Sequence, residues 1–171
     1  YYIAMEYLEG QTIKELVEKT GPLQPRRAVQ ITRQVCAALI EAHGAELVHR
    51  DLKPSNLFAT PDGLGGDFVK ILDFGVVKQM AVDMEFTQAG GTLGSPLFMS
   101  PEQIQDHELD GRSDLYSLGV VLFQMLTGTL PFSARDPLQV LMKHLTQAPP
   151  ALSTANPGVR VPPALEQIVQ R

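Results

Sequence analysis

The chain has 171 residues, 44% of them hydrophobic and 19% charged, a balance typical of a globular domain and not of a disordered segment. Fourteen basic and nineteen acidic residues give a net charge of −5 with no basic run, which argues against nucleic acid or an anionic membrane surface as the main partner. The single cysteine, Cys36, excludes an internal disulfide and fits a reducing compartment, so a cytoplasmic location is expected.

The first twenty residues predict a strand, a connector and a short helix. Residues 1–8 have the pattern of a strand interior that runs into a connector. An unpaired strand has no reason to open a mature chain, so this start indicates a fragment and not a processed natural terminus. Thr12 and Glu15 form a capping box ahead of apolar residues, and Gly21 follows at a suitable distance to end the helix.

A longer helix and two short strands are expected next. Pro25 suits the first turn of the helix, and Gly44 suits a left-handed position just past its end. From 47 to 75 the pattern changes to short strands and turns, with a turn at 61–63 and a strand over 68–72.

The second half of the chain predicts further helices. Residues 76–99 show no sustained periodicity, and Ser100 then begins a second capping-box pattern. Residues 114–127 are apolar almost all round, which predicts a helix buried on every side. The longest strongly apolar stretch, Leu115 to Leu126, is too short and too mixed to span a bilayer, so no membrane segment is expected within this chain. The remaining features are a helix start at Asp136, a proline-rich surface connection over 148–163 and a helical pattern over 164–171.

Four polar residues in the strand-and-turn region have the chemistry of a phosphoryl-transfer site. Asp51 can act as the base that orients an attacking hydroxyl, and Lys53, two residues on, can meet the transferring phosphate. Asn56 offers an amide oxygen and Asp73 a carboxylate, a ligand pair that suits Mg²⁺. Each residue alone is common in loops, but the ordered set joined by two short strands is specific.

The run from His49 to Asn56, followed by Asp73-Phe74-Gly75, resembles the catalytic loop and metal-binding turn of eukaryotic-type (Hanks-type) serine/threonine protein kinases, with a bacterial-like pattern. The resemblance implies an α+β, mostly helical fold in which short strands carry the catalytic loops. It also implies that residues 1–171 form a partial kinase domain, the hinge and most of the C-terminal lobe. The Gly-rich loop and the phosphate-binding lysine are then expected before Tyr1.

The same resemblance implies an activity and further site residues. The full-length protein would transfer the γ-phosphoryl group of ATP, with Mg²⁺, to Ser or Thr hydroxyls of proteins, and dimerisation could activate it. The 171-residue piece alone would be poorly active. The residues implied are Met5, Glu6, Leu8, Phe58 and Leu72 for ATP; Ser95 for substrate positioning; Arg50, Thr87 and Thr92 for regulation; and His49, Phe74, Glu102 and Asp114 for structure.

Several alternatives remain open at this stage. A small-molecule phosphotransferase shares a base and a metal carboxylate but lacks the loop that ends in Ser100-Pro101-Glu102. A pseudokinase or scaffold would be decided by the segment before Tyr1, and Thr87 and Thr92 could be ordinary loop residues. The other histidines have no metal-like spacing and are expected at the surface or at helix ends: His43, His107 and His144.

Overall fold

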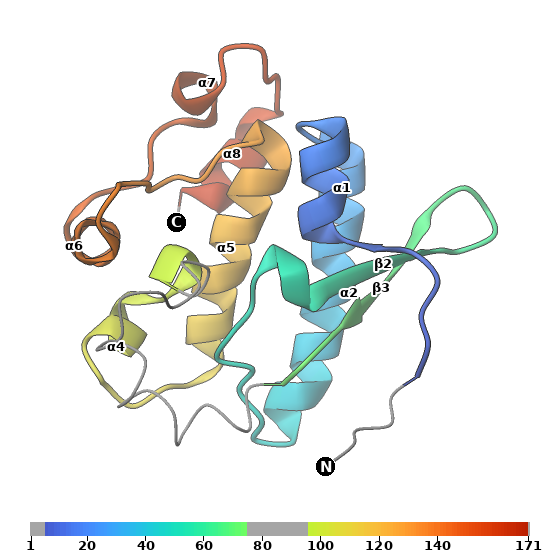
Figure 1. Ribbon diagram of the computed structural model, residues 1–171, viewed down its shortest axis with the longest axis horizontal. Helices are drawn as coiled ribbons and strands as arrows, with labels where there is room; N and C mark the ends of the chain where they lie inside the picture. The colour runs from blue at the N-terminus through green and yellow to red at the C-terminus, as the bar shows by residue number, and fades with distance from the viewer. Residues whose placement is uncertain (1–5, 75–95, 171) are drawn as a thin grey trace.

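A computed structural model describes residues 6–74 and 96–170. Helix α5 (Gly111–Thr127) lies at its centre, with α1 (Ile13–Thr20) and α2 (Pro25–Gly44) packed on one side (Figure 1). On the other side lie the four helices that follow the catalytic region, α4 (Pro101–Ile104), α6 (Pro137–Thr146), α7 (Leu152–Ala155) and α8 (Pro163–Val169). The expected α+β, mostly helical fold is confirmed.

The central position of α5 follows from its composition. Eleven of its seventeen residues are buried, so the helix is enclosed by its neighbours on almost every side. The predicted helix over 114–127 is therefore confirmed and begins three residues earlier, with Asp110 as N-cap and Gly128 as a left-handed C-cap. Arg112 and Leu115 are its two exposed residues, with Leu115 at 52% exposed. None of the described helices is long and apolar enough to cross a membrane.

The two N-terminal helices begin where their capping residues predict. The Thr12 N–H donates to Glu15 Oε2 at 2.7 Å, and the Glu15 N–H donates to Thr12 Oγ1 at 3.2 Å. Helix α2 starts at Pro25 as predicted and buries residues of one face against the core: Ala28, Ile31, Val35 and Leu39. The prediction for Gly44 is wrong. Gly44 is the last helical residue, and the left-handed backbone lies at Glu46 with φ 60°.

A small antiparallel sheet lies beside α2. Its strands are β1 (Gln11–Thr12), β2 (Leu57–Pro61) and β3 (Asp67–Ile71), in the order β1-β2-β3. The β2–β3 hairpin projects from the helical body (Figure 1), and its turn over 62–66 is ordered by Asp62 Oδ1, which accepts the N–H groups of Leu64 and Gly66 at 2.8 Å. The strand pattern predicted over 1–8 is not found at 6–8, where the described backbone is irregular; residues 1–5 lie outside the described part.

The described part of the chain also contains two 3₁₀ turns, η1 (Pro54–Asn56) directly before β2 and η3 (Pro96–Phe98) shortly before α4. The capping box predicted at Ser100 is present, because Ser100 and Gln103 each bind the other's backbone N–H. Helix α6 begins directly after Asp136, whose carboxylate caps it, as predicted. The connection over 148–163 differs from the prediction in one respect, since its middle forms the short helix α7 around the fully buried Leu152.

Candidate active site

The backbone of His49 and Arg50, directly before Asp51, is bound by the buried side chain of Asp114 at the start of α5. Asp114 Oδ2 accepts the backbone N–H of His49 at 2.8 Å, and Oδ1 accepts the N–H of Arg50 at 2.9 Å. His43 Nε2, from the last turn of α2, lies 2.8 Å from the same Oδ2. Arg50 has φ 66°, an unfavourable conformation for a side-chain-bearing residue. The paired carboxylate contacts stabilise that strained backbone next to Asp51.

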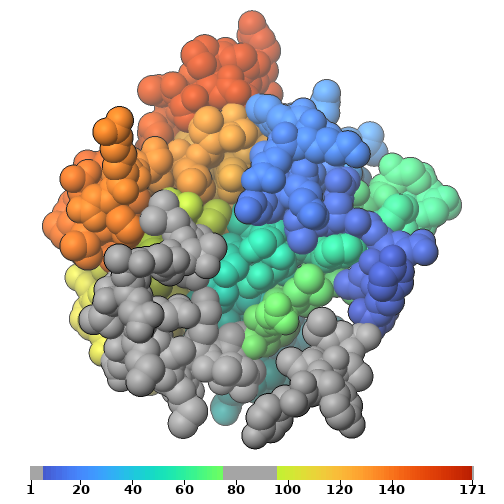
Figure 2. Space-filling model, viewed as in Figure 1, coloured from blue at the N-terminus to red at the C-terminus, as the bar shows by residue number. Residues whose placement is uncertain are grey.

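Asp51 makes hydrogen bonds with the side chains of both Lys53 and Asn56. Lys53 Nζ donates to Asp51 Oδ2 at 2.8 Å. Asn56 Nδ2 donates to the backbone oxygen of Asp51 at 2.8 Å and to Oδ2 at 3.3 Å. The side chains of Asp51 and Lys53 are only 12% and 20% exposed, so water screens their interaction less than it would at the surface. Figure 2 shows this segment, coloured teal, near the middle of the displayed face.

Asp73 is positioned by contacts to the residue before it. The Leu72 N–H donates to the backbone oxygen of Asn56 at 2.8 Å, and His49 Nε2 lies 3.0 Å from the Leu72 oxygen. The rings of His49 and Phe74 are 4.9 Å apart between centroids. Asp73 itself has φ 51° and an exposed side chain. The catalytic loop and the Asp73 turn are therefore joined through His49 and Asn56.

Helix α4 also contacts the loop that carries Asp51, through Gln103. Gln103 Nε2 donates to the Arg50 oxygen at 2.7 Å, while Gln103 also completes the capping box with Ser100. Glu102 Oε1 accepts from Ser113 Oγ at 2.6 Å, which ties α4 to the first turn of α5. The backbone oxygens of Arg50 and Asp51 therefore each accept a hydrogen bond from a side-chain amide. Gln103 donates to the Arg50 oxygen and Asn56 to the Asp51 oxygen.

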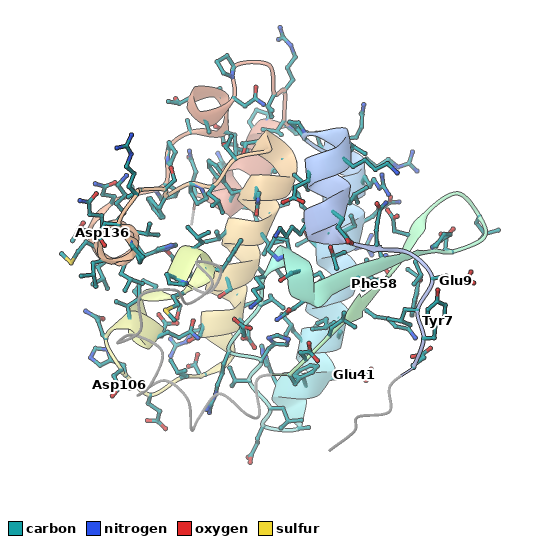
Figure 3. The ribbon with its side chains drawn as sticks, viewed as in Figure 1. Tyr7, Glu9, Glu41, Phe58, Asp106 and Asp136 are labelled. Atoms are coloured by element: carbon teal, nitrogen blue, oxygen red, sulfur yellow. The ribbon has the colours of Figure 1, made fainter. Side chains whose placement is uncertain are left out.

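The connector at the N-terminal end lies against the sheet. Gly10 has φ 149°, and a Cβ there would collide with the carbonyl oxygen of Ala59 in β2. Glu6 pairs with Lys70 of β3, with both carboxylate oxygens 2.7 Å from Nζ. In Figure 3 the connector that carries Tyr7 and Glu9 runs beside the strand that carries Phe58. The structure thus brings the connector, β2 and β3 together.

Comparison with known proteins identifies the family. The profile of the protein kinase domain matches residues 1–167 of the chain. The chain belongs to the protein kinase family.

Three bacterial kinases illustrate the similarity. Serine/threonine-protein kinase pkn3 of Myxococcus xanthus is 43% identical over 173 residues, which cover 99% of this chain and 32% of that protein. Serine/threonine-protein kinase PrkC of Bacillus subtilis is 38% identical over 99% of this chain and 25% of that protein. Serine/threonine-protein kinase PknB of Mycobacterium leprae is 36% identical over 94% of this chain and 25% of that protein. The chain therefore spans a third or less of these relatives.

The described part of this kinase chain brings together most of the residues expected at the site. Asp51 contacts both Lys53 and Asn56, and the residues before and after Asp73 contact Asn56 and His49. Glu6, Leu8 and Phe58 lie on the connector and on β2. Four expected residues lie outside the described part of the structure: Met5, Thr87, Thr92 and Ser95.

Sequence reasoning did not single out three residues that contact α5, the Asp51 loop and β3: His43, Gln103 and Gln34. His43 was expected only as a surface or helix-end residue; it does lie in the last turn of α2, but it also contacts Asp114. Gln103 and Gln34 make hydrogen bonds to residues 53 and 33–35 positions away along the chain. No local pattern reports such distant pairings, although the Gln103 capping box already indicated that α4 begins there.

His144 lies in the last turn of α6, one of the two positions expected for it, but its side chain is buried and not at the surface. His144 is 4% exposed, its Nδ1 lies 2.7 Å from the Tyr116 hydroxyl, and its ring packs edge-on against Phe132 at 4.9 Å. Burial lowers the pKa of His144, with a partly opposing effect from the Leu97 backbone, and burial with the charge of Glu102 raises the pKa of Tyr116 to about 12. Helix α6, which carries His144, packs against η3, and Leu97 is the middle residue of that turn.

Proposed function

We propose that the protein carrying this chain is a serine/threonine protein kinase that transfers the γ-phosphoryl group of ATP to Ser or Thr hydroxyls of proteins. The observation that carries the proposal is the arrangement around Asp51, whose Oδ2 accepts from Lys53 at 2.8 Å and from Asn56 at 3.3 Å. The names of its relatives, all serine/threonine-protein kinases, support the choice of substrate class.

In this proposal Asp51 accepts the proton of the substrate hydroxyl as the oxygen attacks the γ-phosphorus, while the bond from that phosphorus to the β–γ bridging oxygen breaks and ADP leaves. Lys53 orients the Asp51 carboxylate, and its ammonium would lie beside the incoming phosphoryl oxygens. Asn56 and Gln103 fix the backbone on either side, so the carboxylate need not reorganise when the substrate arrives. Positioning and electrostatic stabilisation supply most of the catalysis in phosphoryl transfer.

The donor set fits Mg²⁺. Asn56 uses its amide nitrogen on Asp51, which leaves its carbonyl oxygen as the ligand, and Asp73 adds an exposed carboxylate. One carboxylate and one amide oxygen, completed by water and phosphate oxygens, match the preference of this ion. When bound, Mg²⁺ neutralises charge on the phosphates. Asp73 and Asn56 would hold it, and the joined loops would keep the two ligands at a constant separation.

The remaining roles are those that the resemblance to the protein kinase family implies. The connector at Glu6 and Leu8 would contact adenine, with Met5 behind it and Phe58 and Leu72 beneath. Ser95 would position the substrate hydroxyl, and Arg50 would pair with a phosphate on Thr87 or Thr92 and so regulate the enzyme. Dimerisation could bring two such loops together for phosphorylation in trans.

The chain is proposed to be the hinge and most of the C-terminal lobe of a longer, cytoplasmic-facing kinase. This fits the third or less of its relatives' length that it spans. A Gly-rich sequence does occur at 63–66, but it lies in the β2–β3 turn, where no helix follows to bind phosphate. The phosphate cradle is therefore expected outside these 171 residues.

The test is phosphoryl transfer by the full-length protein from labelled ATP and Mg²⁺ to a protein substrate, followed by phosphoamino-acid analysis. The proposal predicts label on Ser and Thr. Transfer to a small-molecule hydroxyl but to no protein would instead support a small-molecule phosphotransferase. Nucleotide binding without any transfer would support a pseudokinase, and either result would contradict the proposal.

A further inference from the structure

One side chain of α2 covers the outer edge of β3. Gln34 Nε2 donates to the Asp67 carbonyl oxygen at 2.7 Å, and Gln34 Oε1 accepts the Val69 N–H at 3.0 Å. These two backbone groups bind Gln34 on the side of β3 that faces away from β2. That side has no neighbouring strand in the described sheet, whose order is β1-β2-β3. The primary amide therefore makes the two hydrogen bonds that an added strand would otherwise make.

An ion pair holds the same end of β3. Arg27 Nε and Nη2 each donate to one carboxylate oxygen of Asp67 at 2.7 Å, a bidentate geometry that fixes direction as well as distance. We refer to Gln34, Arg27 and Asp67 together as the β3 clamp. Both clamp residues of the helix lie on α2, which packs against the central α5 and so provides a rigid base.

The strand held by the clamp leads directly to the proposed metal ligand. β3 has five residues, and Asp73 follows it by two positions. A strand this short in a small sheet has little stability of its own. A slip of one residue along β2 would move Asp73 by about 3.3 Å and turn alternate side chains to the opposite face. At the Asp73 end, the hydrogen bond from Leu72 to Asn56 resists such a slip, and the clamp resists it at the other end.

We propose that Gln34 is a positioning residue for Asp73, because its hydrogen bonds hold β3 in the register that brings the Asp73 carboxylate and the Asn56 amide onto one divalent cation. The inference rests on the proposed function, in which Asp73 and Asn56 are the pair that binds the cation. A merely structural role for Gln34 would change the stability of the protein but not its affinity for metal.

The experiment uses the full-length protein with Gln34→Met, which keeps an unbranched side chain of similar length and good helix propensity but removes both hydrogen bonds. Gln34→Glu keeps the acceptor for the Val69 N–H and loses the donor to Asp67. Gln30→Met is the matched control. Gln30 lies one turn earlier on α2, is exposed, and its side chain makes no hydrogen bond within the described structure.

The measured quantity is the Mn²⁺ affinity in the presence of a non-hydrolysable ATP analogue, read from the electron paramagnetic resonance signal of free Mn²⁺. Gln34→Met is expected to weaken this affinity about tenfold, as loss of a supporting contact behind a metal ligand does. Gln34→Glu is expected to weaken it less, and Gln30→Met not at all. Hydrogen exchange at the Val69 amide should accelerate in Gln34→Met and stay unchanged in Gln30→Met.

A folded Gln34→Met protein with a fast-exchanging Val69 amide and wild-type Mn²⁺ affinity would overturn the inference, as would equal losses in Gln34→Met and Gln30→Met. If Gln34→Met does not fold, Gln34→Glu decides by the same comparison, with a loss of affinity supporting the inference and wild-type affinity overturning it. The phosphoryl-transfer assay of the proposed function is interpreted independently of the Mn²⁺ affinities. A wild-type protein that transfers no phosphoryl group contradicts the proposed function, while the Mn²⁺ comparison still decides on Gln34.

Discussion

At the scale of single residues, the site depends on one buried carboxylate, that of Asp114, which accepts more than one hydrogen bond. Asp114 is 1% exposed and accepts from two backbone N–H groups while it contacts His43. A buried carboxylate is tolerated only when donors of this kind replace the water it has lost. Asp114 therefore serves the site by holding the backbone of His49 and Arg50, although it lies in a different element from Asp51.

Replacing Asp114 tests this dependence. Asp114→Asn leaves one acceptor oxygen for three donors, and its amide group faces an N–H. We expect the free energy of unfolding to fall by about 2–4 kcal/mol, the range for leaving buried donors unpaired. Urea unfolding of the full-length protein measures the change. Asp136→Asn is the control, because Asp136 is an exposed N-cap where Asn serves equally well. Equal stability of the two variants would contradict the assigned role.

A second residue-scale prediction concerns pH. The pKa of His144 is lowered from its ordinary 6.5 by burial, so below that pH the unfolded chain binds more protons than the folded one. The stabilisation from neutral His144 is present above pH 6.5 and is lost as pH falls towards the folded pKa. Stability should therefore decline more steeply between about pH 7.5 and 5.5 in the wild type than in His144→Gln. His107→Gln, at an exposed position, should retain the wild-type slope; identical slopes in all three proteins would refute the prediction.

At the scale of elements, α5 is the helix on which the others pack, and its core side chains should be the most sensitive to truncation. Phe123 is 1% exposed, so Phe123→Ala should lower the free energy of unfolding by about 3–5 kcal/mol. Leu115→Ala on the same helix should change it by less than about 0.5 kcal/mol, because Leu115 is 52% exposed. Denaturant unfolding of both variants measures the contrast, and similar losses would place the core elsewhere.

The starts of α1, α2 and α6 were predictable, since the capping residues and prolines at Thr12, Pro25 and Asp136 act within one turn, whereas α5 begins three residues before its predicted start. The grouping of Asp51 with Lys53 and Asn56 was predictable for the same reason, because these residues are close together in the sequence. The end of α2 was not. Gly44 satisfied a local rule, but the chain turns left-handed at Glu46 on its way to the His49 contacts. The partners of His43, Gln34 and Gln103 depend on how elements pack, and periodicity carries no such information.

At the scale of the whole molecule, we propose that a phosphate cradle from outside these 171 residues completes the site. We expect the isolated chain to transfer phosphoryl groups at least about a hundredfold more slowly than the full-length protein, since fixed positive charge around the phosphates is often the largest catalytic contribution. Parallel assays at equal concentration with saturating ATP measure the ratio. A steady rate from the isolated chain that matches the full-length protein would contradict the proposed domain organisation.

The central claim, that Asp51 is the catalytic base, is tested most directly by Asp51→Asn in the full-length protein. The rate of phosphoryl transfer to a protein Ser or Thr should fall by about 10²–10⁴-fold, the usual contribution of a positioned base. Affinity for the ATP analogue should stay within a few-fold of wild type. Asp106→Asn, at an exposed left-handed position that Asn also adopts, is the matched control and should retain the wild-type rate. Transfer by Asp51→Asn at the rate of Asp106→Asn would contradict the account.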